Sequence, residues 1–394
     1  MTKDNAFFLT RVECPICRTV NEFETVRVGA YVERGRDTDF CPLEIKWHEP
    51  RYQAYNPLTF FTATCSNCFY TREYNNVFRD WQKDSNFKTY RLRAVKDRHL
   101  EQLAAADSVI KSMGQNLDLA HFPNETAILK LFLAVYDEQL ADRPHQLDLG
   151  RFYLRIGWVF RELEKGENPA VKVLRSLLDQ LHNRQASLGE AAAKLQEELT
   201  VFANHISAHF ETNEVPTAIK AQMVPFKERF SERLIALETQ VDPAGELLTS
   251  LADLLNEYQG ALLGSNDAGG SIGFAGHASF VDYLQSLRPA WDGIVTNEHE
   301  ALKTAVSYYQ TAFEEAREIA PGYQQIQASY LIAELSRRIG DHDTARQYFN
   351  ATIKQGQEFI YQNRNDRSRT ALARKILELA MDQGRENIKA IKKS

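Results

Sequence analysis

Two short segments, Cys14-Pro15-Ile16-Cys17 and Cys65-Ser66-Asn67-Cys68, decide how this 394-residue chain is organised. They contain four of its five cysteines, and in each segment two residues separate the paired thiols. A Cys-x-x-Cys turn places two thiolates close enough to bind one ion, and two such turns complete a tetrahedral zinc site. The pattern therefore predicts a structural Zn²⁺ site. Its four ligands are Cys14, Cys17, Cys65 and Cys68.

Two other interpretations of the paired cysteines are open. Reduced cysteines in an apolar core would need no metal, but this interpretation does not explain the pairing. A disulfide framework is typical of secreted proteins, and residues 1–10 lack the basic and then apolar order of a signal peptide. We therefore expect a cytoplasmic protein whose paired thiols bind metal.

Cys41 and His48 lie between the two cysteine pairs. Cys41 is either a redox-sensitive thiol or spare ligand, or a partly buried small residue of the fold. His48 has no metal-ligand spacing within residues 47–50, so it is only a substitute ligand. The sequence does not decide whether either residue has a metal or redox role.

The cysteine pairs define a small N-terminal lobe. Residues 25–28 alternate as in a strand, residues 60–64 have strand-like composition, and residues 34–42 predict a loop or turn. Between Cys17 and Cys65 lie 47 residues, more than a minimal zinc finger contains. We interpret the site as a zinc-ribbon-like knot, whose metal would supply on the order of 10 kcal/mol of folding free energy.

Helical patterns follow from about residue 90. Residues 127–136 predict a buried apolar helix. Residues 153–163 and 330–340 resemble each other, with Gly157 aligned on Ala333 and Arg161 on Arg337. The second copy continues through a Gly-Asp turn into residues 345–349, a pattern similar to a tetratricopeptide repeat (TPR). A generic helical hairpin is the alternative.

A long insert separates the two similar segments. Residues 170–263 carry leucines at broken heptad spacing and three prolines, which predicts two to four long, coiled-coil-like helices in a hairpin or bundle. The apolar face of this arm serves either internal packing or self-association. The Gly-rich residues 264–276 lack the Gly-Lys-Ser/Thr ending of a phosphate-binding loop, so we interpret them as a linker.

The predicted fold class is mainly α, with a small zinc-ribbon-like β lobe followed by a TPR-like helical body that carries the long helical insertion. The expected parts are the lobe at 1–88, the first TPR-like helices at 89–169, the insert at 170–263, the linker at 264–279, and the second TPR-like helices at 280–394.

Composition limits the possible functions. The chain is 43% hydrophobic and 25% charged, as is usual for soluble proteins. It has no run of about 18 apolar residues, so no membrane span is expected. The net charge of −6 argues against a general nucleic-acid coat protein.

Patterns typical of catalysis are missing from the sequence. There is no HExxH helix, and the G-x-S-x-G match at residues 269–273 lies in the Gly-rich segment, which no predicted strand precedes as a nucleophile turn requires. A four-cysteine zinc site is coordinatively closed and leaves no position for a substrate water. The sequence therefore predicts no catalytic and no cofactor-binding residues, and it argues against an enzyme.

The order of these elements resembles an uncharacterised bacterial family, catalogued as a domain of unknown function, with a four-cysteine zinc-ribbon-like lobe and TPR-like helices. The resemblance covers about residues 1–165 and 300–385, and the insert looks peculiar to this chain. Glycine usually follows each cysteine pair in such knuckles, whereas Arg18 and Phe69 stand there in this chain, so we expect less favourable turn conformations. The resemblance implies a layout and a bacterial cytoplasmic setting, but no reaction. The matching segments are residues 14–17, 36–40, 56–57, 65–68, 153–158 with Arg161, and 330–340.

These observations support two classes of function. The first is a non-enzymatic adaptor that binds a protein or peptide partner through TPR-like helices. The alternative is a zinc-ribbon nucleic-acid-binding or regulatory protein, whose lobe aromatics would stack on bases rather than fill the lobe core. In a third interpretation, Cys41 and the zinc thiolates form a redox switch.

Overall fold

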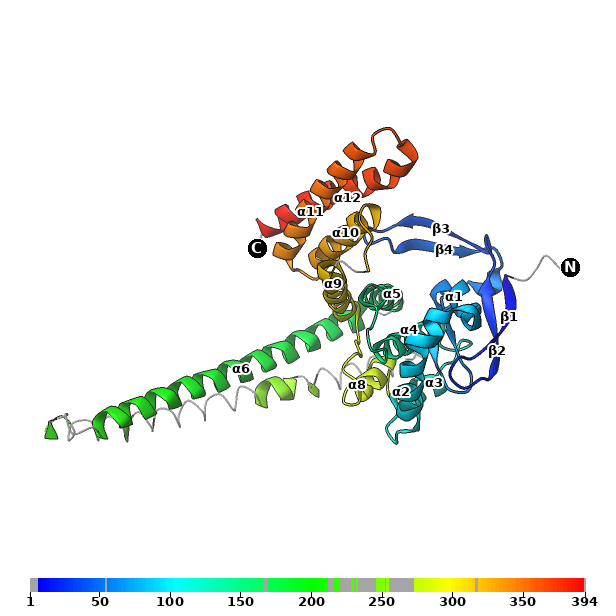
Figure 1. Cartoon of the computed structure of the whole chain (residues 1–394). Coiled ribbons are helices and arrows are strands. Elements are labelled where there is room, and N and C mark those ends of the chain that lie inside the picture. Colours follow the sequence, from blue (N-terminus) through cyan, green and yellow to red (C-terminus); the bar gives the residue numbers. More distant parts are fainter. Residues whose placement is uncertain are drawn as a thin grey trace. The chain divides into compact units, whose positions relative to one another are not determined.

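The computed structural model describes residues 6–53, 55–165, 169–211, 273–315 and 318–392, with isolated positions between 216 and 254 (Figure 1). The chain forms two compact units. One contains Met1–Lys165 and Gly273–Ser394, and the other contains Gly166–Ile272. The finer five-part division made from the sequence stays a prediction.

The N-terminal region of the first unit contains three antiparallel β-hairpins. The loops of the first and third hairpins contain the two Cys-x-x-Cys segments, so each cysteine pair lies at the end of two hydrogen-bonded strands. The strands are β1 (Phe7–Glu13) with β2 (Val20–Val26), β3 (Tyr31–Arg36) with β4 (Pro42–Trp47), and β5 (Thr62–Thr64) with β6 (Thr71–Glu73).

Three predictions for this region need correction at their boundaries. The strand expected at 25–28 ends at Val26. Of residues 60–64, Phe60 belongs to the 3₁₀ helix η2 (Pro57–Phe60), because Asn56 caps the amide of Leu58 and begins a helical turn. The loop expected at 34–42 is confined to 37–41. Residues 34–36 instead continue β3, because main-chain pairing with β4 outweighs their polar character.

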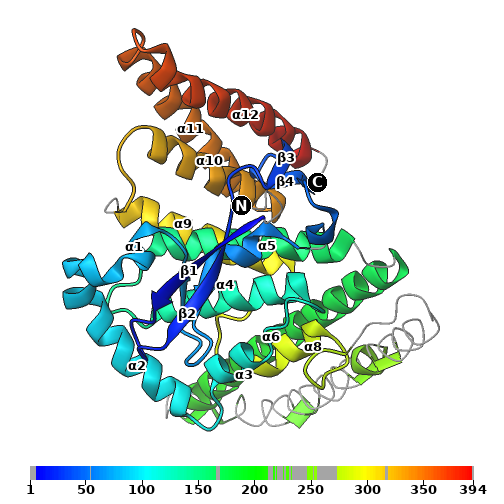
Figure 2. The same cartoon turned by 90° about the vertical axis from the view of Figure 1, so that its right-hand side faces the viewer.

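Helices form the rest of the first unit. α4 packs on α5, α5 on α9, α9 on α10, α10 on α11, and α11 on α12, which gives a layered array (Figures 1 and 2). The longer helices are α2 (Arg93–Ala104), α4 (Pro123–Gln139), α5 (Gln146–Lys165), α9 (Glu298–Glu315), α10 (Tyr323–Arg338), α11 (His342–Gln362) and α12 (Arg367–Ile391). The shorter ones are α1 (Asn76–Arg79), α3 (Val109–Gln115), α8 (Phe280–Leu287), η1 (Pro50–Tyr52), η3 (Trp81–Lys83) and the π-helical η4 (Phe87–Leu92).

α4 is the centre of the core, as its apolar sequence predicts. Its side chains from Ala127 to Leu129 and from Leu131 to Val135 are at most 2% exposed. They join residues of α3, α5, α8 and α9 in one apolar cluster. The residues that the sequence assigns to a buried helix are therefore buried on several sides.

The two similar sequence segments form α5 and α10, which each pack closely on a partner helix. A Cβ added at Gly157 would lie 3.0 Å from Leu302 Cδ2, so glycine permits the close approach of α5 and α9. α10 and α11 form a hairpin through Gly340, which has φ 83°. Ala345 and Phe349 are buried in one cluster with α10, as expected from their spacing. Whether these helices are TPR repeats stays a prediction.

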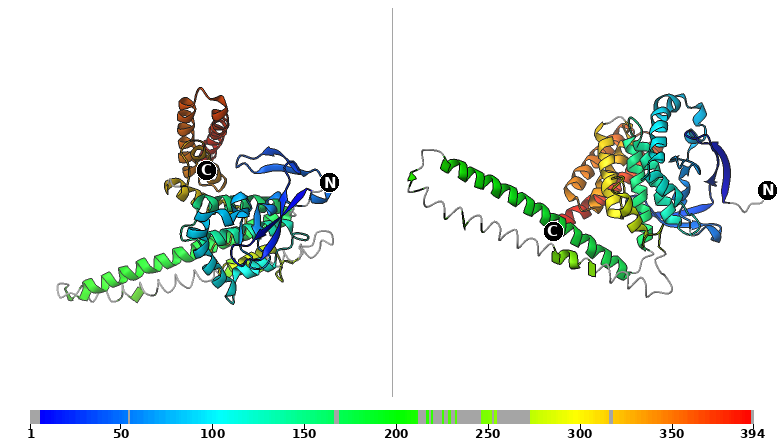
Figure 3. Two further views of the ribbon diagram at one scale, coloured as in Figure 1. Left: turned by 45° about the vertical axis from the view of Figure 1, so that its right-hand side comes forward. Right: turned by 90° about the horizontal axis from the view of Figure 1, so that it is seen from below.

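The second unit contains α6 (Pro169–Glu211), a helix of 43 residues (Figure 3). Gln185 of α6 donates a hydrogen bond of 2.9 Å to Thr249 Oγ1. Leu247, Leu251 and Leu254, expected in a coiled-coil seam, are 71%, 43% and 61% exposed. Most other residues of the predicted later helices, and the linker up to 272, lie outside the described residues. Within the described part of the chain, no helix is apolar over a length sufficient to cross a bilayer.

Candidate metal centre and ligand cleft

The two cysteine turns have the same backbone structure. In the first, the Cys14 amide donates to Thr19 O at 2.8 Å and the Arg18 amide donates to Cys14 O at 3.1 Å. In the second, the matching bonds from Cys65 to Tyr70 and from Phe69 to Cys65 measure 2.9 and 3.0 Å. Each hairpin therefore presents its two thiols from an equivalent turn.

The residue after each cysteine pair has a left-handed backbone conformation. Arg18 has φ 67° and Phe69 has φ 62°, which confirms the less favourable turn expected where glycine is missing. Such conformations cost a side-chain-bearing residue about 1–3 kcal/mol. Contacts of the two side chains offset this cost. Arg18 Cζ lies 4.9 Å from the centre of the Trp81 ring, and the Phe69 ring packs directly over Gly114.

The four thiols converge on one point. The Cys14 and Cys68 Sγ atoms are 3.7 Å apart, those of Cys17 and Cys65 are 3.5 Å apart, and all four lie within 4.8 Å of one another. A tetrahedron of sulfur ligands 2.3 Å from zinc has edges of about 3.8 Å, whereas a disulfide has a length of about 2.05 Å. The four cysteines form no disulfide, and their spacing fits a metal ion.

The electrostatics of the cluster also favour a cation. The hydrogen bond with Cys65 raises the pKa of Cys14 to about 12, and the hydrogen bond with Cys14 raises the pKa of Cys68. The same interaction with Cys14 lowers the pKa of Cys65. In a largely buried group of four thiols, one thiolate suppresses ionisation of its neighbours. A bound cation would stabilise all four thiolates and release their protons.

Asn21 of β2 joins the two cysteine turns. Its Nδ2 donates to Thr19 O at 3.0 Å and to Cys65 Sγ at 3.5 Å. Its Oδ1 accepts hydrogen bonds from the amide and hydroxyl of Ser66 at 2.8 and 2.9 Å. Asn21 is only 6% exposed, so this single side chain fixes one turn relative to the other.

His99 and Asp137 join the second cysteine turn to the helices. His99 Nε2 donates to Cys68 O at 2.8 Å, while its Nδ1 lies 2.6 Å from Asp137 Oδ1. Asp137 Oδ2 also accepts from the Thr71 amide at 2.6 Å. Burial lowers the pKa of His99, but the charge of Asp137 and the hydrogen bonds to Asp137 and Cys68 O together outweigh burial and raise it. Through this chain of hydrogen bonds, α2 and α4 hold the second cysteine turn in place.

The structure places Cys41 and His48 away from the four-cysteine cluster. Cys41 is buried at the turn of the β3–β4 hairpin, where its thiol contacts Pro42 O at 3.6 Å. His48 is exposed after β4. Neither belongs to a group of possible metal ligands in the described residues. The buried position of Cys41 matches the interpretation of it as a small residue of the fold.

The tip of the β3–β4 hairpin reaches the helical array near α10 (Figure 1), and its acidic residues form ion pairs with α5 and α10. Asp39 is fully buried, accepts from Trp158 Nε1 at 3.1 Å, and lies 2.6 Å from Arg161 Nη2. Asp37 bridges Arg161 at 3.1 Å and Arg338 at 2.6 Å. We call this group the hairpin latch. Its members are Asp37, Thr38, Asp39, Trp158, Arg161, Tyr330, Glu334 and Arg338.

On the α10 side of the hairpin latch, the buried polar side chains of Glu334 and Tyr330 also have hydrogen-bond or ion-pair partners. Glu334, which is completely buried, pairs with Arg337 at 2.7 Å and with Arg338 at 3.0 Å and accepts from the Thr38 hydroxyl. Tyr330 donates to Thr38 O at 2.8 Å. Arg161 and Arg337, aligned from the sequence, therefore both lie in or beside the latch. Two helices far apart in sequence are joined by the lobe.

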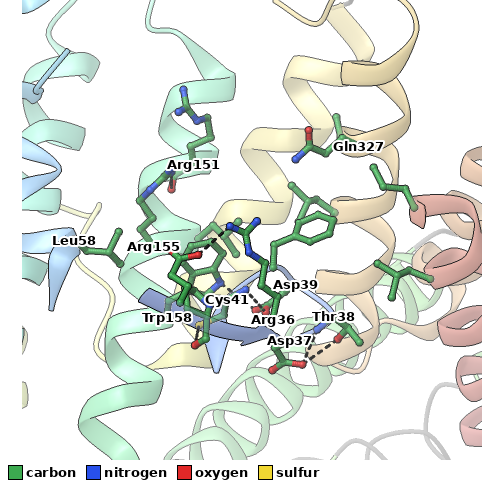
Figure 4. A pocket seen from close by; sticks show the side chains of 18 of the residues that line it. Arg36, Asp37, Thr38, Asp39, Cys41, Leu58, Arg151, Arg155, Trp158 and Gln327 are labelled. Carbon is green, nitrogen blue, oxygen red and sulfur yellow. Dashed lines mark hydrogen bonds and ion pairs between the residues drawn. The ribbon is translucent and has the colours of Figure 1, made fainter. Parts of the chain in front are cut away.

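Beside the hairpin latch lies an open cleft of about 1080 Å³, which we call the hairpin cleft (Figure 4). Its walls come from the β3–β4 hairpin and η2 on the lobe side and from α5, α10 and α12 on the helical side. Most of its side chains are apolar, including Leu154, Leu331 and Leu372. Arg151 and Arg155 stand along α5, and Gln327 lies on α10 (Figure 4).

Comparison with known families identifies the sequence pattern. The family model described as "Uncharacterized protein conserved in bacteria (DUF2225)" matches residues 7–211 and 285–375. The chain belongs to the DUF2225 family. The match includes the four cysteines and the hairpin latch of this DUF2225 protein. Comparisons with curated proteins and with solved structures gave no match.

The family match corrects one expectation. It extends through residue 211, so the first part of the insert, including α6, belongs to the DUF2225 pattern and is not peculiar to this chain. The leucines of residues 170–211 predict a helix, but one sequence does not show whether such a helix is common to a family or specific to one chain.

Several residues of the cysteine cluster and of the hairpin cleft belong to no sequence motif that would predict their role. Asn21, His99 and Asp137 have no fixed spacing from the cysteines, and they reach the metal-facing turns only because β2, α2 and α4 fold around them. Arg155 lies within the repeat-like segment, but its sequence does not distinguish it from a surface arginine.

Proposed function

We propose that this DUF2225 protein is a non-enzymatic adaptor with a zinc-stabilised lobe and a TPR-like helical body that binds a protein or peptide partner. The hairpin cleft is the observation that carries the proposal. A volume of about 1080 Å³ whose walls combine a larger apolar surface with several charged and polar side chains suits a segment of another polypeptide.

The zinc ion has a structural role in this proposal, with Cys14, Cys17, Cys65 and Cys68 as its ligands. The sulfur spacings of 3.5 and 3.7 Å support a tetrahedral site. Four thiolates fill such a coordination shell, so zinc would have no open position to activate water. A closed site of this kind supports a folding role rather than catalysis.

The lobe takes part in partner binding because the β3–β4 hairpin supplies one wall of the hairpin cleft. That hairpin is fixed to α5 and α10 by the hairpin latch. Zinc binding would thus support the cleft indirectly, by keeping the rest of the lobe folded beneath the hairpin. In this arrangement the metal stabilises the lobe, and the lobe and the helices together form the partner-binding cleft.

Photo-crosslinking in the source cell tests the adaptor function. A benzoylphenylalanine placed at Gln327, within the hairpin cleft, should give one discrete crosslinked partner. The matched control places the same residue at Lys303, which is exposed on α9 and does not line the cleft. Absence of a crosslinked species at Gln327, or equal products at both positions, would count against the adaptor.

A nucleic-acid-binding function is the alternative carried by the aromatic lobe. The rings of Tyr52, Tyr55 and Phe60 pack against one another and against Phe7. Tyr70 is buried beside His99. These contacts support a core role for the lobe aromatics. Fluorescence anisotropy with labelled DNA and RNA at low salt tests the alternative, because phosphate contacts would give affinity that falls steeply with salt.

Two further parts of the proposal concern location and assembly. We place the protein in the cytoplasm, which cell fractionation can test, because free paired thiols are kept reduced there. We also propose self-association through the helical insert, supported by the exposed leucines Leu247, Leu251 and Leu254. Sedimentation of the full chain and of a Leu251→Glu variant should then differ in mass.

A further inference from the structure

Arg155 contacts an aromatic ring and a main-chain carbonyl, whereas the neighbouring arginines Arg151 and Arg161 pair with carboxylates. Its Cζ lies 4.2 Å from the centre of the Phe61 ring, and its Nη1 donates to Arg151 O at 3.0 Å. Within the described part of the chain, no carboxylate forms an ion pair with it. Arg151 pairs with Asp148 at 2.9 Å and Glu73 at 3.6 Å, and Arg161 pairs with three carboxylates.

The position of Arg155 is electrostatically costly. Burial lowers its pKa from the ordinary value, and the neighbouring charge of Arg151 lowers it further. A guanidinium nevertheless stays protonated in proteins. The more distant carboxylates of Glu73 and Asp148 offset these effects only in part. Arg155 is thus a half-buried cation without an ion pair, and its charge is well suited to stabilisation by an anion from outside the chain.

The geometry of Arg155 also prepares it for binding. Stacking on Phe61 and the bond to Arg151 O restrict the plane of the guanidinium. Only one of its five N–H donors is needed for that bond. The remaining donors retain the fork geometry that binds a carboxylate through two parallel hydrogen bonds.

Four carboxylates line the hairpin cleft, those of Glu33, Asp37, Asp39 and Glu162, and none of them forms an ion pair with Arg155 in the described residues. Asp37 and Asp39 are held by Arg161 and Arg338 in the hairpin latch. Glu33 pairs with Arg36 at 2.9 Å. Lys375 of α12 adds an exposed cation to the opposite wall. Around these cations the cleft surface is mostly apolar, so it complements a segment that combines a carboxylate with apolar side chains.

We propose that Arg155 binds the side-chain carboxylate of an Asp or Glu within an extended partner peptide, whose flanking apolar side chains occupy the hairpin cleft. This inference rests on the proposed adaptor function. The cleft is open rather than enclosed and has walls from both lobe and helices, so an internal segment of a chain can pass through it. The carboxylate would determine which peptides bind, and the apolar walls of the cleft would supply most of the buried contact area.

A peptide selection followed by a double-mutant cycle tests the proposal. Random dodecapeptides displayed on phage are selected on the full-length, zinc-loaded protein, and the selected sequences are synthesised with amidated C-termini. We expect an Asp or Glu flanked by apolar residues. Replacing that acid by its amide should weaken binding at least about 30-fold, as should Arg155→Gln. With Arg155→Gln, the acidic peptide and its amide analogue should bind equally, because the pair is already broken.

Controls separate this result from misfolding. Lys303→Gln removes a positive charge from α9 outside the hairpin cleft and should bind the peptides as the wild type does. Arg155→Gln should keep the zinc content of the wild type and its cooperative thermal unfolding. Arg155→Lys retains the charge but not the fork, and should recover only part of the affinity.

The outcomes distinguish this inference from the proposed function. Selected peptides without an acidic residue, peptides that bind only through a free C-terminal carboxylate, or equal affinity for wild type and Arg155→Gln would overturn the role of Arg155 but leave the adaptor function intact. Failure of the wild type to select any peptide would contradict both.

Discussion

Arg161 Nη2 lies 2.6 Å from Asp39 Oδ2 and thereby joins the tip of the β3–β4 hairpin to helix α5. Asp39 is fully buried, and Arg161 has 13% of its side chain exposed. The same arginine contacts Asp37 and Glu298. Since the hairpin belongs to the cysteine lobe and α5 to the helical array, this ion pair couples the two parts of one unit.

Asp39→Asn should destabilise the protein strongly. Removing one charge from a buried, hydrogen-bonded pair leaves the partner without full compensation, which typically costs about 3–5 kcal/mol. Asp343→Asn is the matched control, because Asp343 and Arg346 form an exposed pair at 3.0 Å and such pairs contribute at most about 1 kcal/mol. Urea unfolding of both variants checks the prediction. Equal losses of unfolding free energy would show that the hairpin latch does not hold the hairpin.

Gly114→Ala should loosen the second cysteine turn. A Cβ at this position would lie 2.1 Å from the Phe69 ring, and overpacking of this kind costs about 1–3 kcal/mol. Displacement of Phe69 should also speed zinc loss to a chelator. Gly384→Ala on α12 is the control, since its Cβ would meet only Phe349 at 3.7 Å, and replacing glycine in a helix usually stabilises by up to about 1 kcal/mol. A Gly114→Ala protein that keeps wild-type zinc kinetics would contradict the described packing.

Lys130 should make stability depend on alkaline pH. Its ammonium donates to Thr59 O, and burial lowers its pKa from 10.5 to about 8. Between these values the unfolded chain binds more protons than the folded one, so the free energy of unfolding should rise as pH rises from about 8 to 10.5. The measurement compares wild type with Lys130→Met, in which this contribution is missing. A constant difference between the two proteins across this range would refute the assignment.

Metal removal should unfold the lobe before the helical array. Cys14→Ser/Cys65→Ser should lose bound zinc and the near-ultraviolet circular dichroism of the lobe tryptophans Trp47 and Trp81, because structural zinc sites supply on the order of 10 kcal/mol. Helical signal from α4, α9, α10 and α11 should largely persist. Cys41→Ser, which lies outside the cysteine cluster, should keep one zinc per chain. Loss of zinc from Cys41→Ser would instead assign that thiol to the site.

Patterns within short stretches of sequence predicted the cysteine turns and the buried helix α4. The spacing of Cys14 and Cys17 and of Cys65 and Cys68 leads to one cluster, because a two-residue gap fixes the turn. The apolar run of α4 is buried, because eight of the nine residues from 127 to 135 are apolar and leave only Lys130 as a polar side chain. The positive φ of Arg18 and Phe69 follows from the same turn geometry.

The parts that depend on long-range contacts were not predictable from one chain. Arg161 and Arg337 are similar positions in the sequence, but Asp39, the partner of Arg161, lies 122 residues earlier in the chain and has no local signal. Glu334 lies only three residues before Arg337, so that pair is local, whereas its contact with Thr38 of the hairpin is not. The loop at 34–42 was predicted too long because strand pairing with β4 decides residues 34–36. The contacts of Asn21 and His99 with the cysteine turns, and the lack of an ion pair for Arg155 in the described residues, likewise depend on tertiary structure.

The central proposal is that the four-cysteine cluster is a closed structural zinc site, which supports the fold of the lobe and takes no direct part in partner binding. X-ray absorption at the zinc edge of the purified, zinc-loaded protein tests this claim most directly. The account predicts one zinc per chain with four sulfur neighbours at about 2.3 Å and no oxygen or nitrogen ligand. A spectrum that requires a bound water or other light ligand, or fewer than four sulfur atoms, would contradict it.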